Sequence, residues 1–187
     1  MMRKTMTRVF TIADYEEEEI WLREQHQNGW KLVKMTVPCF YTFESCEPED
    51  VIYRLDFRNM ERSEEYMQML KDFGWEYFDQ CMGWLYFRKP AAAIESEEEG
   101  ELFSDNESRV NLVSHVMKTR LLPLAIIFLC CVIPNFVKCV SGSYIGYAGF
   151  FLGILFAVLF VIYVVLLVHC GTKLRRIRNK YRTGLNG

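Results

Sequence analysis

The stretch FGWEYFDQCMGWLYFRK, Phe73 to Lys89, repeats the layout of an earlier stretch, NGWKLVKMTVPCFYTFE, Asn28 to Glu44. Both contain Gly-Trp near the start and both end in a segment rich in aromatic residues. A shift of 45 residues without gaps superimposes them, and the aligned pairs are Gly29 with Gly74, Trp30 with Trp75, and Tyr41 with Tyr86. This agreement predicts one folding unit that occurs twice.

Each copy shows the same order of predicted elements. RVFTIA (8–13) and VIYRLDF (51–57) alternate apolar and polar residues, as half-buried strands do. The helices predicted next have acidic first turns, and Ser63 is a plausible cap for the second. Each helix must end at a glycine, Gly29 or Gly74, which favours a left-handed turn. Two aromatic strands complete each copy. The fold class is therefore α+β: a duplicated strand-helix-strand-strand domain, with an antiparallel sheet of six strands and two helices on one face.

Two apolar segments follow the duplicated part. LLPLAIIFLCCVIPNFV (121–137) contains one polar residue, and YIGYAGFFLGILFAVLFVIYVVLLV (144–168) has no charged or amide side chain. A membrane-spanning helix needs about 20 such residues. We therefore predict two transmembrane helices, at about 119–139 and 144–168, joined as a tight hairpin, and a bend at Pro134.

The composition divides the chain into four parts. They are a tandem domain at 1–92, an acidic flexible linker at 93–117, the two spans within 118–170, and a basic tail at 171–187. Basic residues near membrane spans are retained on the cytoplasmic side. We therefore expect a cell-membrane protein with two spans and with both termini cytoplasmic. The predicted topology anchors are Lys118, Arg120, Lys173, Arg175, Arg176 and Arg178.

Small residues recur along the second span at intervals that place them on one helix face: Gly146, Gly149, Gly153 and Ala157. A face of this kind lets another helix backbone approach closely. Two interpretations are open, homo-oligomerisation and packing against the other helix of the same hairpin. The basic tail could in addition bind anionic lipid.

The sequence also resembles a known family. The residues that carry the resemblance are EEEEIWLREQHQNGWKL, YTFE, DVIYRLDFR, YMQMLKDFGWEYF and GWLYFRKP, within about residues 8–90. They resemble the bacterial membrane-protein family called domain of unknown function 2812 (DUF2812). The resemblance implies this domain followed by C-terminal membrane helices, and it implies no activity or catalytic residue. The element order is also similar to gyrase-inhibitor-like small-molecule-binding domains, in architecture only.

No motif in the sequence indicates catalysis. The phosphate-binding, dinucleotide-binding, nucleophile-elbow and zinc-protease patterns do not occur, and the seven cysteines have no metal-ligand spacing. The glutamate run at 16–19 reads as a solvated face, and His26, His115 and His169 read as surface or interfacial residues. Residues 1–92 hold twelve basic and seventeen acidic residues, which disfavours nucleic-acid binding. We expect no cofactor, no metal, no catalytic residue and no enzyme.

The aromatic residues are too many to be buried on one face of a sheet, because successive strand residues point to opposite faces. We therefore predict a groove between the two copies for an apolar small molecule or peptide, formed by Trp30, Tyr41, Trp75, Trp84 and Tyr86. The preferred function is a membrane-anchored, non-enzymatic sensor or interaction module with an unknown ligand or partner. The alternative is an accessory subunit of a membrane transporter or stress-response complex, in which the helices contact another membrane protein or a second copy.

Overall fold

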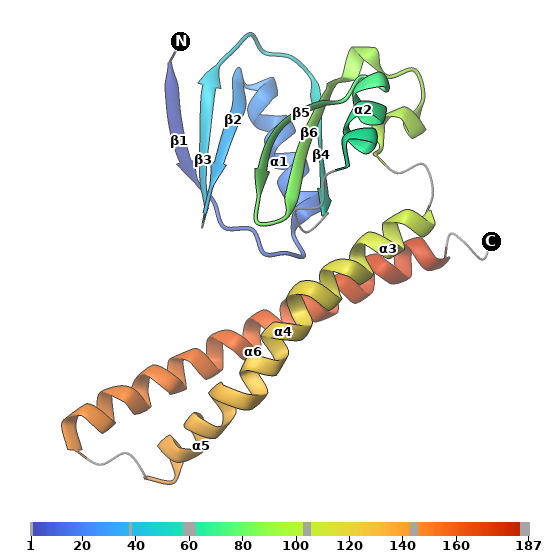
Figure 1. Cartoon of the computed structure of the whole chain (residues 1–187). Coiled ribbons are helices and arrows are strands. Elements are labelled where there is room, and N and C mark those ends of the chain that lie inside the picture. Colours follow the sequence, from blue (N-terminus) through green and yellow to red (C-terminus); the bar gives the residue numbers. More distant parts are fainter. Residues whose placement is uncertain (1, 38, 58–62, 103–105, 143–145, 184–187) are drawn as a thin grey trace. The chain divides into compact units, whose positions relative to one another are not determined.

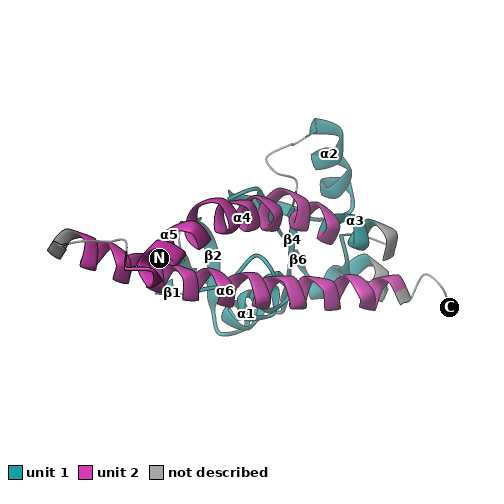
Figure 2. Ribbon diagram, turned by 90° about the horizontal axis from the view of Figure 1, so that it is seen from below, with its two compact units in different colours: residues 1–112 teal, residues 113–187 magenta. Residues whose placement is uncertain are grey.

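The computed structural model describes residues 2–37, 39–57, 63–102, 106–142 and 146–183. The chain divides into two compact units, residues 1–112 and residues 113–187, shown in different colours in Figure 2. The first unit holds both copies of the duplicated sequence, and the second consists of helices (Figure 1). The start of the second predicted span (144–145) and the end of the basic tail (184–187) lie outside the described residues.

The predicted α+β fold is confirmed, and each copy contains strand, helix, strand and strand in that order. The elements of the first copy are β1 (Arg3–Thr7), α1 (Tyr15–Gln27), β2 (Trp30–Thr36) and β3 (Phe40–Ser45). Those of the second copy are β4 (Val51–Phe57), α2 (Glu64–Asp72), β5 (Glu76–Cys81) and β6 (Trp84–Pro90).

The two copies share their sheet topology as well. The strands form two antiparallel sheets of three strands, in the orders β1-β3-β2 and β4-β6-β5, so the last strand of each copy lies in the middle. The pairing register shifts between Leu32 and Lys34 in β2 and between Tyr77 and Asp79 in β5. These irregularities occupy the same position in the two copies. The duplication therefore extends to a β-bulge that the sequence did not reveal.

Side chains, and not a strand ladder, connect β2 to the second sheet. The backbone N–H of Met35 donates a hydrogen bond to Asp79, and Nη1 of Arg88 donates to the carbonyl oxygen of Leu32 at 3.1 Å. The described strands therefore form two sheets where the sequence predicted a single six-stranded one.

Helix α1 contacts both sheets. The ring of Trp21 lies 5.0 Å from that of Tyr41 and 5.7 Å from that of Phe43, both in β3. Tyr15 stacks on Trp84 of β6 at 5.4 Å. All five side chains are buried. The core of the first unit is thus built around α1.

Helix α2 covers the other face of the second sheet. Leu70 forms a buried cluster with Trp75, Leu85 and Phe87. Leu85 and Phe87 alternate along β6 with Tyr86, which points to the α1 side. Figure 2 shows α1 and α2 on opposite sides of β4 and β6. The prediction of two helices on one face is therefore wrong, because β6 is apolar on both faces and each face needs a cover.

The first strand lies earlier in the chain than residues 8–13, where the sequence predicted it. β1 ends at Thr7, and residues 8–13, predicted as a strand, form an irregular segment that leads into α1. Phe10 packs 5.7 Å from the ring of Trp21, while Val9 is 76% exposed. The alternation of apolar residues here reflects packing against α1 and not strand pairing.

The predicted helix ends are confirmed. Gly29 and Gly74 adopt φ values of +80° and +83°, the left-handed conformation that glycine accepts without strain. Ser63 caps α2, since its hydroxyl accepts a hydrogen bond from the backbone N–H of Tyr66 at 3.1 Å.

The segment predicted as a flexible linker at 93–117 has local structure in its described part. It contains a 3-10 turn at Glu97–Gly100 and the helix α3 (Asn106–Val116), preceded by a turn at Ala91–Ala93. A methyl group on the buried Gly100 would lie 3.7 Å from Ile52 of β4. The compact first unit accordingly extends to residue 112 and not to residue 92.

The second unit consists of two long helical stretches that lie side by side (Figure 1). In the first, the end of α3 (residues 113–116), α4 (Leu122–Ile127) and α5 (Ile133–Val140) are joined by π-helical turns at Met117–Leu121 and Phe128–Val132. The second is α6 (Gly146–Thr183). The rings of Phe136 and Phe160 stack at 4.2 Å between them.

The two stretches Ser108–Val140 and Gly149–Arg182 are long and apolar enough to cross a membrane, because they contain 18-residue windows with mean hydropathies of 2.2 and 3.2. Large apolar side chains such as Phe151 and Val161 are exposed along them. Each π-helical turn precedes a proline, Pro123 or Pro134. Proline lacks the N–H that an α-helix needs, and the wider turn accommodates this loss without ending the helix.

Candidate functional site

A buried carboxyl group joins the two copies of the first unit. Glu18 of α1 is 6% exposed, and its Oε1 accepts hydrogen bonds from the hydroxyls of Tyr41 at 3.0 Å and Tyr86 at 2.8 Å. These tyrosines occupy equivalent positions in β3 and β6. The equivalent tyrosine of each copy therefore donates a hydrogen bond to the same carboxyl oxygen of Glu18.

Burial raises the pKa of Glu18 from 4.5 to about 7, although the hydrogen bonds from Tyr86 and Tyr41 oppose the rise. Removing a carboxylate from water disfavours its charged form, and two hydroxyl donors compensate only part of this loss. Glu18 is therefore a group whose charge can change near neutral pH.

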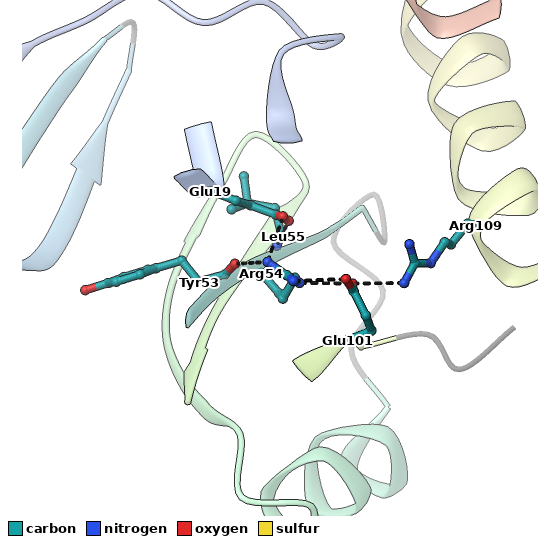
Figure 3. A network of polar contacts seen from close by, with 6 residues as sticks. All are labelled: Glu19, Tyr53, Arg54, Leu55, Glu101 and Arg109. Carbon is teal, nitrogen blue, oxygen red and sulfur yellow. Dashed lines mark hydrogen bonds and ion pairs between the residues drawn. The ribbon is translucent and has the colours of Figure 1, made fainter. Parts of the chain in front are cut away.

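The adjacent Glu19 belongs to a polar network on β4 (Figure 3). Its Oε1 accepts the backbone N–H of Leu55 at 2.7 Å, and Nη1 of Arg54 lies 3.3 Å from its Oε2. Arg54 also donates two hydrogen bonds of 3.0 Å to Glu101, which in turn pairs with Arg109 at 3.0 Å. Burial raises the pKa of Glu19 to about 8 against the opposing effects of Arg54 and the Leu55 N–H.

A third buried polar group lies near the end of α1. His26 is 5% exposed, and its Nδ1 lies 2.8 Å from the hydroxyl oxygen of Tyr53. Burial, with a contribution from Arg88 and Lys31, lowers the pKa of His26 to about 4. The imidazole is therefore neutral at physiological pH. The expectation of a surface histidine is wrong at this position.

A polar pocket of about 310 Å³ opens beside His26. Arg88 is fixed in it by Glu76, which accepts from its Nε at 2.7 Å, and this guanidinium holds the pKa of Glu76 below its usual value. Both copies contribute to the lining, which consists of His26, Lys31, Cys46, Glu47, Glu49, Val51, Glu76, Arg88 and Pro90.

The five aromatic residues predicted to form one groove occupy different places. Tyr41 and Tyr86 meet at Glu18, and Trp84 packs on the α1 side of β6. Trp30 lies under the Lys4 ammonium at 3.9 Å. Trp75 lies on the α2 side, where it lines a depression of about 620 Å³ between α2 and β5 together with Ser63, Glu64, Met67, Gln68, Lys71, Glu76 and Tyr77. Ligand binding by the aromatic residues stays a prediction.

The predicted membrane residues lie in the second unit. Gly146 is the first residue of α6, Gly153 is buried, and Gly149 and Ala157 are half-buried on the same helix. Lys118 and Arg120 lie in the turn before α4, and the remaining anchors, Lys173, Arg175, Arg176 and Arg178, lie in the last turns of α6. Homo-oligomerisation through the glycines stays a prediction.

The sequence did not predict the burial of Glu18, Glu19 and His26, and there is one physical reason for this. A helix with four consecutive glutamates is normally solvated on that face, but α1 lies against two sheets and most of its circumference is covered. The signal that was available is the pair Tyr41 and Tyr86, since buried tyrosine hydroxyls require a hydrogen-bond partner.

The fold and the site define a class: a duplicated strand-helix-strand-strand unit with buried carboxyl groups, joined to two helices that could span a membrane. The chain belongs to the family described as "Protein of unknown function (DUF2812)", which matches it over residues 14–125. The match includes the duplicated unit from α1 onward and reaches the first apolar helix. No curated protein and no solved structure matches the chain.

Proposed function

We propose that this protein is a non-enzymatic sensor or interaction module, attached to the cytoplasmic face of the cell membrane by a hairpin of two helices. The observation that carries the proposal is the polar pocket between the two copies. Because its lining comes from α1 and β2 of one copy and from β5 and β6 of the other, a bound ligand would contact both. Binding of a ligand in the pocket would then change the strength of the contact between the two copies.

The chemistry of the pocket favours binding over catalysis. Arg88 and Glu76 neutralise each other, and His26 is already within hydrogen-bond distance of Tyr53. The lining also includes the cation of Lys31 and the carboxylates of Glu47 and Glu49. This arrangement suits a small molecule or peptide end that carries both charges.

Attachment to the membrane is supported by the distribution of charge and apolar surface. All 24 acidic residues lie in residues 1–112, and residues 113–187 contain none. Apolar side chains are exposed along α6, whose last turns are basic. Lipid would cover these side chains, and the basic turns favour a cytoplasmic C-terminus.

The ligand proposal is tested by stability measurements on the full chain in detergent. All four tryptophans lie in the first unit, so their fluorescence follows the unfolding of that unit alone. A library of small zwitterionic metabolites should contain compounds that stabilise it, by about 2.7 kcal/mol at a concentration of 100 Kd.

Lys31→Gln should abolish this gain, whereas Lys34→Gln, a matched change at an exposed position of the same strand, should leave it intact. Absence of any stabilising compound, or the same gain in the Lys31→Gln variant, would contradict ligand binding in this pocket.

A further inference from the structure

The helix α6 is longer than a membrane requires. It has 38 residues, which correspond to about 57 Å, nearly twice the roughly 30 Å of bilayer hydrocarbon. A methyl group on Gly171 would lie 3.9 Å from Leu121 Cδ2, and Leu121 directly follows Arg120. The charged boundary of the first apolar stretch therefore lies level with residue 171 of α6. The turns after Gly171 extend beyond the apolar segment.

These turns have a buried seam. Cys170, Leu174 and Ile177 are 3%, 0% and 5% exposed, at the spacing of one helix face. The cations lie on its two sides. The arginine flank consists of Arg175, Arg178 and Arg182, and the opposite flank consists of Lys173, Arg176 and Lys180.

The arginine flank contains an unsatisfied donor. The Nε of Arg178 is buried and has no hydrogen-bond partner among the described residues. A buried N–H without an acceptor is destabilising, although Arg178 as a whole is only half-buried. Residues 113–187 contain no aspartate or glutamate, so this unit has no side-chain carboxylate to offer.

The position of the flank identifies the anion. Arg175 lies four residues beyond Gly171 and Arg178 seven, which is about 6 Å and about 10 Å along the helix axis. Side chains of a helix lean toward its N-terminus, which for α6 is the direction of the apolar segment. Both guanidinium groups can therefore reach the headgroup layer, where planar guanidinium binds phosphate oxygens in pairs.

We propose that Arg175 and Arg178 of the arginine flank bind the phosphate of an anionic phospholipid. This inference rests on the proposed membrane attachment. Binding there would hold the extended part of α6 at the membrane surface. The opposite flank would contribute only unspecific attraction to a negative surface.

The test uses the full chain in detergent and native mass spectrometry with added phosphatidylglycerol or phosphatidylcholine. Phosphatidylglycerol should bind more tightly than phosphatidylcholine. The double variant Arg175→Gln/Arg178→Gln should weaken phosphatidylglycerol binding at least about tenfold, because it removes the charge-assisted hydrogen bonds from the guanidinium groups to the phosphate. The matched variant Arg176→Gln/Lys180→Gln removes the same charge and should weaken it less than about threefold.

An equal loss in the two variants would overturn the proposal in favour of unspecific attraction, and equal binding of the two lipids would overturn it as well. Displacement of the lipid by millimolar inorganic phosphate would reassign the site to free phosphate.

Alkaline carbonate extraction of the wild-type chain from membranes separates the proposed lipid site from the proposed membrane attachment. A chain that resists extraction but shows no lipid preference refutes only this inference, whereas an extractable chain refutes the membrane attachment. Unchanged tryptophan fluorescence of both variants excludes misfolding of the first unit.

Discussion

Replacing Glu18 by glutamine should stabilise the first unit at alkaline pH. In the folded chain the pKa of Glu18 is about 7, above its ordinary value of 4.5. Below about pH 4.5 the carboxyl is protonated in both the folded and the unfolded chain. As the pH rises toward 7 only the folded chain keeps the proton, so the free energy of unfolding decreases. Above pH 7 the loss is complete and amounts to about 3 kcal/mol, at about 1.4 kcal/mol for each unit of difference in pKa.

Glutamine avoids this loss because it does not ionise, while its Oε1 can still accept the hydroxyls of Tyr41 and Tyr86. The free energy of unfolding should therefore be up to about 3 kcal/mol higher for Glu18→Gln than for the wild type at pH 8, and only about 1 kcal/mol higher at pH 5. The assay is urea unfolding of the full chain in detergent, followed by tryptophan fluorescence at several pH values. Glu17→Gln, an exposed neighbour on the same helix, is the matched control and should show no such gain.

The reasoning would be refuted if wild type and Glu18→Gln lost the same stability between pH 5 and pH 8. It would also fail if the glutamine variant were the less stable of the two at pH 8. Glu19 contributes its own pH dependence, but that contribution is common to both proteins and cancels in the comparison.

Two further predictions use the same urea assay. Gly29→Ala should lower the free energy of unfolding by about 1–2 kcal/mol, and Gly74→Ala should lower it by less. At Gly29 a methyl group would lie 3.1 Å from the carbonyl oxygen of Cys46, whereas at Gly74 it would lie 3.4 Å from the movable Lys89 side chain. Equal losses in the two variants would contradict this steric argument. Arg54→Met should lower the free energy of unfolding by about 3 kcal/mol at pH 9 and by clearly less at pH 6, because the pKa of Glu19 is about 8 and only its ionised form needs the guanidinium. A loss of stability that does not depend on pH would show that Arg54 acts through packing.

The duplicated architecture could be predicted because local rules act in the same way on both copies. The gap-free shift aligned the glycines that end the two helices, and both adopt the left-handed conformation. The same shift misplaced β1, because β1 ends 22 residues before Gly29 whereas β4 ends 17 residues before Gly74, and most of this difference lies in the helices, which have 13 residues in α1 and 9 in α2. Pattern reasoning over short stretches cannot distinguish a strand from a segment that packs its apolar residues on a helix.

The candidate site could be predicted only in part. A groove between the copies was predicted from the duplication, but the pocket at Arg88 is lined by none of the five predicted aromatic residues. Its polar lining and the burial of Glu18 did not follow, because burial of α1 on several sides depends on two sheets distant in sequence. A charged residue is assigned to the surface unless its partners are known, and the partners Tyr41 and Tyr86 lie 23 and 68 residues away.

The most direct test of the account is the position of the two helix ends relative to the membrane. In a chain whose other cysteines are replaced by serine, Cys139 marks the end of the first apolar stretch, and Lys180→Cys in a cysteine-free chain marks the last turns of α6. A membrane-impermeant maleimide added to right-side-out vesicles should label Cys139, and should label the cysteine at position 180 only after the vesicles are opened. Labelling of position 180 in sealed vesicles, or protection of Cys139 until they are opened, would contradict a hairpin with both ends in the cytoplasm.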